Sequence, residues 1–509
     1  MTAVWGMARA TSMALVGLEA TAVDVEAWIG SGLPRTTLVG LPDAALTQAK
    51  ERCRSAVLSA GHHWPPQVLT INLVPATLPK AGSHYDLAIA AAVLAAQGVI
   101  EPDTLSAVVL FGELGLDGRV HPVRGALSAV LGARRLGWTK VVVAQRQMAE
   151  AALVPDMVVF GAADLGDVID ILRGGPGVEP LPVEAGSADP VTPPDLGDVV
   201  GLDQAKWALE VAAAGRHHLY FHGPPGVGKT LLASCLPTIL PDLSAEESME
   251  VASIQSLAGH DVAGLPLRPP YAAPHHTASL AALAGGGARV ARPGAVSLAH
   301  RGVLFLDEAP EFSAVALEAL RTPLESGEIL LSRSEASVRY PARFQLVLAA
   351  NPCPCGLAQT PRSGCRCTPT AIRRYAARLS GPILDRIDIQ APIHPLSRSL
   401  VANRGPAADS SAVVAVRVRQ ARERQARRLA GTPWRTNAEV SGAHIRSLPL
   451  PDGIEVLEAA LSAGRLSARG TDKVLKVAWS IADLRGGDRP SADDLHVALA
   501  LRQGEEWIG

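Results

Sequence analysis

The sequence predicts a multidomain protein of the α/β class, with a parallel-sheet core and a helical carboxyl-terminal region. Its 509 residues exceed what one hydrophobic core usually organises, so two or three domains are expected. Strand-like and helix-like runs alternate in the first third of the chain. Further along, a glycine-rich loop joins an apolar strand to a helix, and two more apolar strands follow. In the first third, the strand-like runs are Val68 to Val74, Ala107 to Phe111 and Lys140 to Ala144, and the helix-like runs are Ala44 to Ala60, Leu87 to Ala96 and Ala126 to Leu136.

Two breaks in this pattern divide the chain. Residues 173–196 are rich in proline and glycine, which do not sustain helical or ladder hydrogen bonds, so this stretch is the predicted linker. A weaker boundary lies near Pro395 to Ala408, where serine, glycine, proline and asparagine cluster, and the pattern beyond it is helical. We therefore expect an α/β domain at 1–172, a second α/β domain at 197–395 and a helical lid domain at 396–509.

The composition is that of a folded protein. Hydrophobic residues make up 48% and charged residues 19% of the chain, which argues against long disorder. A net charge of −2 gives no overall attraction to nucleic acid, so any such binding must come from local basic surfaces. The longest apolar run, Leu87 to Ile100, is too short to span a bilayer, and the amino terminus lacks a secretory pattern. We therefore expect a cytoplasmic protein without membrane contact.

Residues 223–230, GPPGVGKT, fit the phosphate-binding pattern G-x-x-x-x-G-K-[ST]. They lie between an apolar strand, His218 to Phe221, and a predicted helix beginning at Thr230. Glycines let backbone N–H groups turn toward phosphate oxygens, and the helix N-terminus adds a partial positive charge. Lys229 is expected to reach the β and γ phosphates of ATP, and Thr230 to ligate magnesium. The residues of this predicted cofactor site are Gly223, Pro224, Pro225, Gly226, Val227, Gly228, Lys229 and Thr230.

Two carboxylates and an amide follow further predicted strands. Gly302 to Leu306 is an apolar run that ends in Asp307 and Glu308, which places both acids at the sheet edge where ligands bind in parallel α/β folds. Asp307 is predicted to hold magnesium through water, and Glu308 to orient and deprotonate the attacking water. The run Phe344 to Ala350 ends in Asn351, whose amide would fix the same water. A turn-forming Asn-Pro pair is the alternative.

Two arginines are candidates for contact with the phosphates. Phosphoryl transfer spreads charge over the γ oxygens, so a guanidinium from a neighbouring subunit would stabilise it. Arg386 is the candidate for this role, and a surface salt bridge with Asp385 or Asp388 is the alternative. Arg469 lies at the start of a predicted helix, from which it would reach the phosphates as part of a lid.

The order of these motifs is similar to that of the magnesium-chelatase-like AAA+ ATPases, and within them of the ComM/YifB subfamily. The motifs are the phosphate loop, LFLDE, NPCPCG, LDRID and SARG. The other matching segments are Gly40 to Ala45, Ile71 to Gly82, Pro274 to His276 and Ser297 to Phe312, so the resemblance runs over nearly the whole chain. It implies that Asn351 is the first sensor, Arg386 the arginine finger and Arg469 the second sensor.

Four cysteines lie on the loop at 353–367. Cys353, Cys355, Cys365 and Cys367 form two C-x-C pairs separated by nine residues. Four thiolates on a short loop suit tetrahedral zinc better than a disulfide framework, although C-x-C is tighter than the commoner C-x₂-C spacing. Reduced cysteines on a proline- and glycine-containing loop are the alternative. Zinc would fix the segment that directly follows Asn351.

The first domain resembles the proteolytic domain of Lon-type proteases. The segments that carry this resemblance are Leu78 to Ala90 and Leu116 to Ala144. In that family a serine nucleophile is activated by a lysine within hydrogen-bond reach. This chain has His84 and Leu127 at the two positions, so no peptidase activity is expected. A substitute dyad of Ser83 and Lys80 is a weaker alternative, and binding or ring assembly is the expected role.

The resemblance implies a homo-hexameric motor that uses ATP and magnesium to move branched or single-stranded DNA in recombination and natural transformation. A basic predicted helix would contact phosphates, or would instead pack against the protein or join subunits; its arginines are Arg417, Arg419, Arg422, Arg424, Arg427 and Arg428. A predicted hairpin, Glu328 to Arg343, would present its tip near Arg333 to a pore or be a merely exposed turn. The alternatives are a protein-remodelling ATPase and a chelatase-like metal-insertion motor, the latter needing partner subunits.

Overall fold

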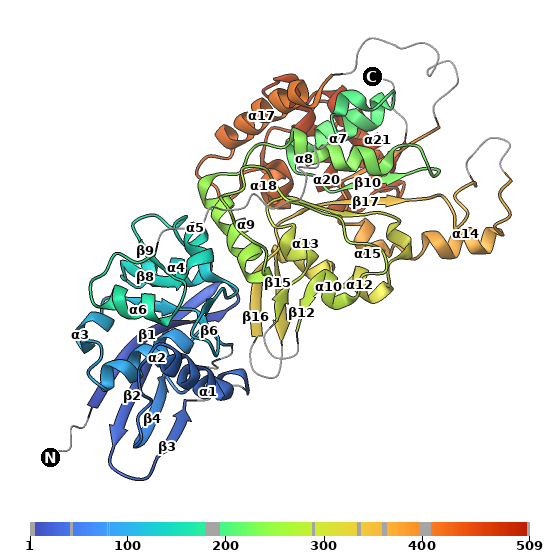
Figure 1. Ribbon diagram of the computed structural model, residues 1–509. Helices are drawn as coiled ribbons and strands as arrows, with labels where there is room; N and C mark the ends of the chain where they lie inside the picture. Colours follow the sequence, from blue (N-terminus) through green and yellow to red (C-terminus); the bar gives the residue numbers. More distant parts are fainter. Residues whose placement is uncertain are drawn as a thin grey trace.

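The computed structural model describes residues 6–40, 44–78, 80, 82–178, 194–287, 291–332, 337–358, 364–395 and 409–505. It shows an amino-terminal α/β unit beside a larger unit formed by the rest of the chain (Figure 1). Most of the predicted linker, residues 179–193, lies outside the described part. Within the described ranges, no helix is both long enough and apolar enough to cross a membrane.

The amino-terminal unit is built on a seven-stranded mixed sheet with the order β3-β4-β2-β1-β5-β8-β9. Strands β1 and β2 form a long antiparallel pair, whereas β1, β5, β8 and β9 run parallel. The predicted strand at 68–74 forms with these bounds, and the one at 107–111 begins at Val109. The strands are β1 (Gly6–Val16), β2 (Glu19–Gly30), β3 (Arg35–Val39), β4 (Val68–Val74), β5 (Val109–Phe111), β8 (Lys140–Ala144) and β9 (Val158–Ala162).

Helices cover both faces of this sheet because the strand residues alternate between two cores. Val142 points into the core with α1, α2 and α6, and its neighbours Val141 and Val143 point into the core with α4 and α5. Helix α2 is almost entirely apolar, and all its residues are buried. The helices are α1 (Ala44–Ser59), α2 (Asp86–Ala96), α3 (Pro102–Leu105), α4 (Ala126–Arg135), α5 (Met148–Ala151) and α6 (Leu165–Leu172).

The second unit is built on a five-stranded parallel sheet with the order β11-β14-β17-β10-β18. Since all five strands are parallel, their carboxyl ends meet at one edge, where ligands bind in open α/β sheets. Strand β14, which precedes Asp307 and Glu308, is not a neighbour of β10, because β17 lies between them. The strands are β10 (Leu219–His222), β11 (Tyr271–Ala272), β14 (Val303–Leu306), β17 (Gln345–Ala350) and β18 (Ile389–Pro392).

Short helices and a hairpin cover one face of this sheet, and longer helices cover the other. The hairpin consists of β15 (Glu328–Ser332) and β16 (Ser337–Pro341), as predicted, and its tip with Arg333 lies outside the described residues. The remaining elements of this region are α7 (Asp203–Gly215), α8 (Lys229–Ile239), α9 (Ala245–Ala258), α10 (Leu280–Ala284), β12 (Gly285–Gly286), β13 (Arg292–Pro293), α11 (Ala295–Leu298), α12 (Ala314–Glu318), α13 (Arg321–Ser326), α14 (Pro369–Ala376) and α15 (Gly381–Leu384).

The carboxyl-terminal helices pack directly on the sheet domain. Side chains of α17 and α20 share one hydrophobic core with those of α7 and α8, so the core continues across the predicted boundary near residue 396. The division at 396–509 stays a prediction. The helices are α17 (Ser411–Arg428), α18 (Gly442–Ser447), α19 (Glu455–Ser462), α20 (Ala468–Arg485) and α21 (Ala492–Gln503).

Most of the predicted basic stretch on α17 is used for packing. Arg417 pairs with Glu210 of α7 at 2.6 Å, and Arg422 donates to the Ala213 carbonyl. Arg428 forms a two-armed ion pair with Asp483 of α20. Arg424 donates to the Asp483 carbonyl. Of the six arginines, Arg419 and Arg427 are exposed and are the two that remain for contact with a partner.

The two units meet through the turn between β1 and β2. This turn reaches the hairpin: a Cβ added at Gly17 would lie 2.7 Å from Val338. Helix α9 of the larger unit also contributes Ala252 to the core of the amino-terminal unit, and Gly125 N–H donates to the Ser256 carbonyl at 3.2 Å. The amino-terminal unit is therefore docked on α9 and the hairpin at the same time.

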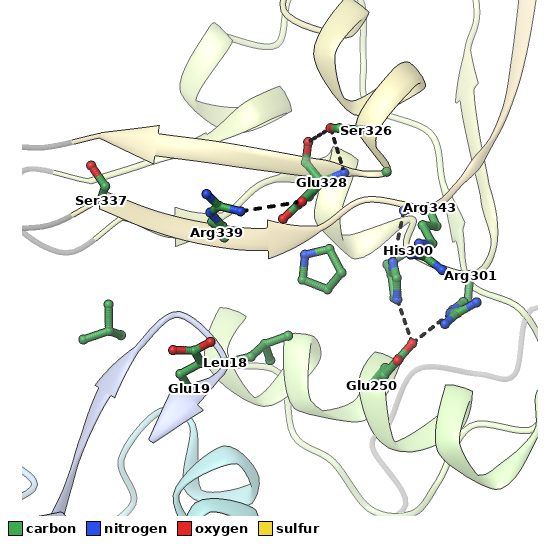
Figure 2. A pocket seen from close by; sticks show the side chains of 13 residues that line it. Leu18, Glu19, Glu250, His300, Arg301, Ser326, Glu328, Ser337, Arg339 and Arg343 are labelled. Carbon is green, nitrogen blue, oxygen red and sulfur yellow. Dashed lines mark hydrogen bonds and ion pairs between the residues drawn. The ribbon is translucent and has the colours of Figure 1, made fainter. Parts of the chain in front are cut away.

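A pocket of about 590 Å³ lies beside this junction (Figure 2). Leu18 and Glu19 line it from the amino-terminal unit, and residues of α9 and the hairpin line it from the larger one. His300 is neutral there, because its Nδ1 accepts from the Arg343 backbone N–H while Nε2–H donates to Glu250. That hydrogen bond, together with Arg301, lowers the pKa of Glu250 to about 2. The junction thus carries a fixed network of charges next to the hairpin.

His84 supplies a pH-dependent contribution to stability in the amino-terminal unit. Burial lowers the pKa of this ring, which packs against Tyr85 and Phe111, to about 4. Between about pH 6.5 and 4 the unfolded chain binds a proton that the folded state does not, so stability falls as the pH falls. Asp86 has a pKa raised to about 6 by burial and acts in the opposite direction.

We expect His84→Gln to remove the histidine contribution while leaving that of Asp86. In urea titrations, the free energy of unfolding of the natural protein relative to the variant should fall by about 1.4 kcal/mol per pH unit as the pH drops from about 6.5 to 4. His63→Gln, at an exposed histidine, is the control. Parallel profiles for the natural protein and His84→Gln would contradict the assignment of a buried neutral ring.

Candidate nucleotide site and cysteine cluster

The phosphate-type loop lies at the carboxyl edge of the parallel sheet, between β10 and α8. Gly226 and Gly228 have φ angles of +76° and +93°, which a glycine adopts without strain. A Cβ at Gly223 would lie 2.2 Å from the Ile393 carbonyl oxygen, so a side chain has no room there. Helix α8 begins at Lys229, one residue before the predicted helix start at Thr230. The local sequence thus places the loop and the N-terminus of α8 together at the carboxyl edge of the sheet.

Lys229 joins this loop to the neighbouring strand. Its buried ammonium donates to the carbonyls of Gly223 and Pro224 at 2.7 and 2.8 Å, and to Asn351 Oδ1 at 3.0 Å. Burial lowers the pKa of Lys229, and Asp307 and Glu308 act against this effect by favouring the charged form. The predicted lysine and the predicted amide are therefore in direct contact.

Thr230 and Asp307 also meet, as a pair of magnesium ligands would. The Thr230 hydroxyl donates to Asp307 Oδ2 at 2.6 Å. The other oxygen, Oδ1, accepts from the Glu308 backbone N–H at 2.9 Å. Hydroxyl and carboxylate oxygens suit a hard cation such as magnesium, which retains several waters when bound to proteins. The donor set at this edge fits that ion.

Glu308 lies two residues after the end of β14 and has a left-handed conformation with φ of +49°, which is uncommon for a residue with a side chain. About half of the Glu308 side chain is exposed. His276 Nδ1 lies 3.4 Å from Glu308 Oε2, and the His275 ring lies against His276. The sequence motif Pro274 to His276 pointed to these histidines, but no role in the site was assigned to them.

Tyr375 is a second residue that motif analysis missed. It lies on α14, and its hydroxyl is close to the backbone of Asn351. Burial raises the pKa of Tyr375 to about 12, so the hydroxyl stays protonated. No local pattern marks this tyrosine, because its contact with Asn351 depends on how α14 returns to the sheet.

Arg386 and Arg469 lie together at the opposite edge of the sheet. Arg386 precedes β18 by three residues and is therefore at the amino ends of the strands, with Glu325 of α13 as its ion-pair partner. Arg469 NH2 lies 3.7 Å from the same Glu325 carboxylate. Lys473, one turn further on α20, donates to the Arg386 carbonyl at 2.8 Å. Within one chain, neither arginine is hydrogen-bonded or ion-paired to the described residues of the phosphate loop.

The four predicted cysteine ligands come together in space. Their Sγ atoms all lie within 4.8 Å of one another. Gly356, between the two C-x-C pairs, faces the phosphate loop: a Cβ there would be 2.6 Å from Pro225 Cδ. The cluster is therefore adjacent to the nucleotide site. Thiolate sulfurs in this number suit zinc.

His84 and Leu127, which stand at the positions of the Lon serine and lysine, are both buried, and Ser83 and Lys80 do not form a substitute dyad. Leu127 is buried in the core, and the His84 ring packs among aromatic side chains. The Ser83 hydroxyl donates to Glu113, while the Lys80 ammonium donates to the Pro75 carbonyl. Ser83 and Lys80 are each bonded to another group rather than to one another.

Comparisons with known proteins agree with this architecture. Family models described as "Magnesium chelatase, subunit ChlI", "Subunit ChlI of Mg-chelatase" and "Magnesium chelatase, subunit ChlI C-terminal" match residues 195–401, 25–147 and 408–502. The chain is 52% identical over 503 residues to an uncharacterized protein of Mycobacterium tuberculosis, covering 98% of this chain and 99% of the relative. It is 43% identical to the uncharacterized protein YifB of Escherichia coli and 40% identical to the competence protein ComM of Haemophilus influenzae, with 96% of each chain covered.

The amino-terminal region shows a further, partial similarity. The sequence is 30% identical to Lon protease 2 of Bacillus subtilis over 168 residues. This match covers 30% of each of the two chains. The chain therefore belongs to the ComM/YifB family of magnesium-chelatase-like AAA+ ATPases and carries a Lon-protease-like amino-terminal domain.

Proposed function

We propose that the protein is a homo-hexameric motor that hydrolyses ATP to move DNA branch points in recombination and natural transformation. The observation that carries the ATPase part is the meeting of Lys229, Thr230, Asp307 and Asn351 at one sheet edge. The DNA part is supported by 40% identity to a relative named for competence. We place this activity in the cytoplasm.

The loop and its helix hold the nucleotide. Backbone N–H groups of residues 226–230 bind phosphate oxygens at the α8 N-terminus, where the helix dipole favours negative charge. When ATP binds, the Lys229 ammonium gives up its hydrogen bonds to the loop carbonyls and donates to oxygens of the β and γ phosphates, which are charged and therefore stronger acceptors. Thr230 and Asp307 hold magnesium, which when bound neutralises the charge that builds up on the phosphates.

Glu308 activates the attacking water. Its half-exposed carboxylate belongs to the residue that follows Asp307, and we assign it the removal of a proton from water aimed at the γ phosphate. Asn351 fixes the same water and the Lys229 ammonium. His276, 3.4 Å from the carboxylate, positions Glu308 between cycles.

Arg386 and Arg469 act on the nucleotide of a neighbouring subunit. Both guanidinium groups lie at the sheet edge opposite their own phosphate loop, so a head-to-tail ring is required to bring them to a γ phosphate. Glu325 pairs with both arginines within the chain. On assembly, the neighbour's phosphate competes with this carboxylate, so that the finger is engaged only in a closed ring.

Two other functions remain as alternatives within the same ATPase framework. A protein-remodelling motor would use the Lon-like domain to bind polypeptide, although this domain lacks the serine and lysine pair. A metal-insertion motor would need partner subunits. We favour DNA, with the hairpin β15–β16 and the exposed Arg419 and Arg427 as the surfaces that contact phosphates.

The role of Glu308 is tested by Glu308→Gln. We expect this variant to bind ATP as the natural protein does but to turn over about two or more orders of magnitude more slowly, because it lacks the base. Glu311→Gln is the matched control, since that carboxylate pairs with Arg378 at 2.8 Å. Normal hydrolysis by Glu308→Gln would remove this residue from the proposed mechanism.

The substrate is tested by measuring ATP hydrolysis with branched DNA, single-stranded DNA, unfolded protein or no addition. We expect stimulation by DNA, strongest with branched DNA, and no stimulation by unfolded protein. Lys229→Ala, which removes the phosphate-binding ammonium, should abolish the signal in every arm. Stimulation by unfolded protein alone would replace the DNA proposal with the remodelling one.

The trans position of the finger is tested by mixing two inactive variants. Arg386→Ala keeps an intact phosphate loop, and Lys229→Ala keeps an intact finger. In randomly mixed rings about one quarter of the interfaces combine both intact halves, so the mixture should regain hydrolysis that neither variant shows alone. A mixture as inactive as its components would argue for a finger that serves its own subunit.

A further inference from the structure

We propose that Cys353, Cys355, Cys365 and Cys367 bind one zinc ion that holds the loop after β17 against the phosphate-binding loop. The metal site stands on the cysteine geometry alone. Its effect on the nucleotide site rests on the proposed ATPase function, and the two parts are tested by different measurements.

The cysteine sulfurs already have the spacing of a tetrahedral site. The Sγ atom of Cys353 lies 3.4 Å from that of Cys355 and 3.9 Å from that of Cys365, and Cys355 and Cys365 are 3.6 Å apart. Zinc–sulfur bonds of about 2.3 Å in a tetrahedron place the sulfurs about 3.8 Å from one another. A zinc ion therefore fits with little movement of the backbone.

The same distances exclude disulfides in this arrangement. A disulfide needs its sulfurs about 2.05 Å apart, well below the values here, and all four cysteines are free thiols in the structure. The convergence of all four on one point is what a single metal ion requires.

The backbone around the sulfurs supports a ligand role. The backbone N–H groups of Leu357 and Cys367 lie near Cys355 Sγ and Cys365 Sγ, respectively. Such N–H groups stabilise the thiolate form and fix the direction of each ligand. A zinc ion with four thiolates carries two net negative charges, and Arg366 lies in sequence between two of the ligands.

The cluster is joined to the nucleotide site at two places. Asn351, which accepts from Lys229, is only two residues before Cys353. At the second place, the Gly356 backbone lies so close to Pro225 that a Cβ would overlap its ring. Gly356 also has a φ of +77°, which favours glycine. A metal that fixes residues 353–356 thus fixes both the sensor amide and the outer side of the phosphate loop.

The metal part is tested by elemental analysis of the purified full-length protein. We expect about one zinc per chain, at least a tenfold loss in the double variant Cys355→Ser and Cys367→Ser, and full retention in Cys53→Ala, which removes a buried thiol of the amino-terminal unit. Natural protein that is metal-free while its thiols are reduced would overturn the proposal, as would zinc retained by the double variant.

Cobalt replacement identifies the ligands independently of protein yield. Tetrahedral cobalt with four thiolates gives intense visible bands, which we expect in the natural protein and in Cys53→Ala but not in the double variant. Iron in place of zinc in the protein as purified, with the red colour of an iron–thiolate site, would overturn the choice of metal.

The coupling part is tested by Gly356→Ala, which leaves the ligands in place but pushes the loop off Pro225. We expect this variant to keep its zinc while losing at least about tenfold in ATP affinity, measured with a fluorescent nucleotide, the scale on which support around a metal site acts. If Gly356→Ala and the zinc-free double variant both bound ATP as tightly as the natural protein, the proposed coupling between the metal site and the nucleotide site would be wrong. Because binding is measured rather than turnover, this outcome is distinct from a failure of the proposed motor function.

Discussion

The nucleotide site depends on one contact, the bond from the Lys229 ammonium to the Asn351 side chain at 3.0 Å. It exists because β17 lies between β10 and β14, which puts the end of β17 next to the phosphate loop. Asp307 follows β14, the strand on the other side of β17 from β10, and accepts a hydrogen bond from Thr230 of α8. The geometry of the candidate site is therefore fixed by the strand order: a sheet with β14 beside β10 would leave no place for the Asn351 amide between the phosphate loop and Asp307.

The sequence predicted those parts of the site that are encoded within a few residues. The loop GPPGVGKT, the Asp-Glu pair after an apolar run and the asparagine after the next strand each carry their own local geometry, and parallel strands must bring their carboxyl ends to one edge. The bounds of β14 and β17 were predicted within one residue, because an apolar run of four to six residues leaves little freedom for its ends. The cysteine cluster was predicted for the same reason, since its two pairs lie on one short loop. The long antiparallel pair of β1 and β2 was not predicted.

Contacts between distant segments could not be predicted in this way. A run of arginines on α17 reads the same in sequence whether it faces DNA or Glu210 and Asp483, and four of the six turn inward. The pairing of Arg386 and Arg469 on Glu325 depends on how α20 crosses the amino edge of the sheet, which no local pattern specifies. Tyr375 and His276 were missed because each meets its partner through a fold-back of the chain.

In the Lon-like domain, buried side chains stand at the two positions that match the serine and lysine of Lon-type proteases. A buried neutral His84 and a buried Leu127 stabilise a sheet whose β1–β2 turn touches β16, and β16 leads through three residues into β17 and so to Asn351. The same domain is bound to α9, the helix that follows the phosphate-loop helix α8. The domain junction, the hairpin and β17 are therefore joined by one continuous stretch of backbone and packing.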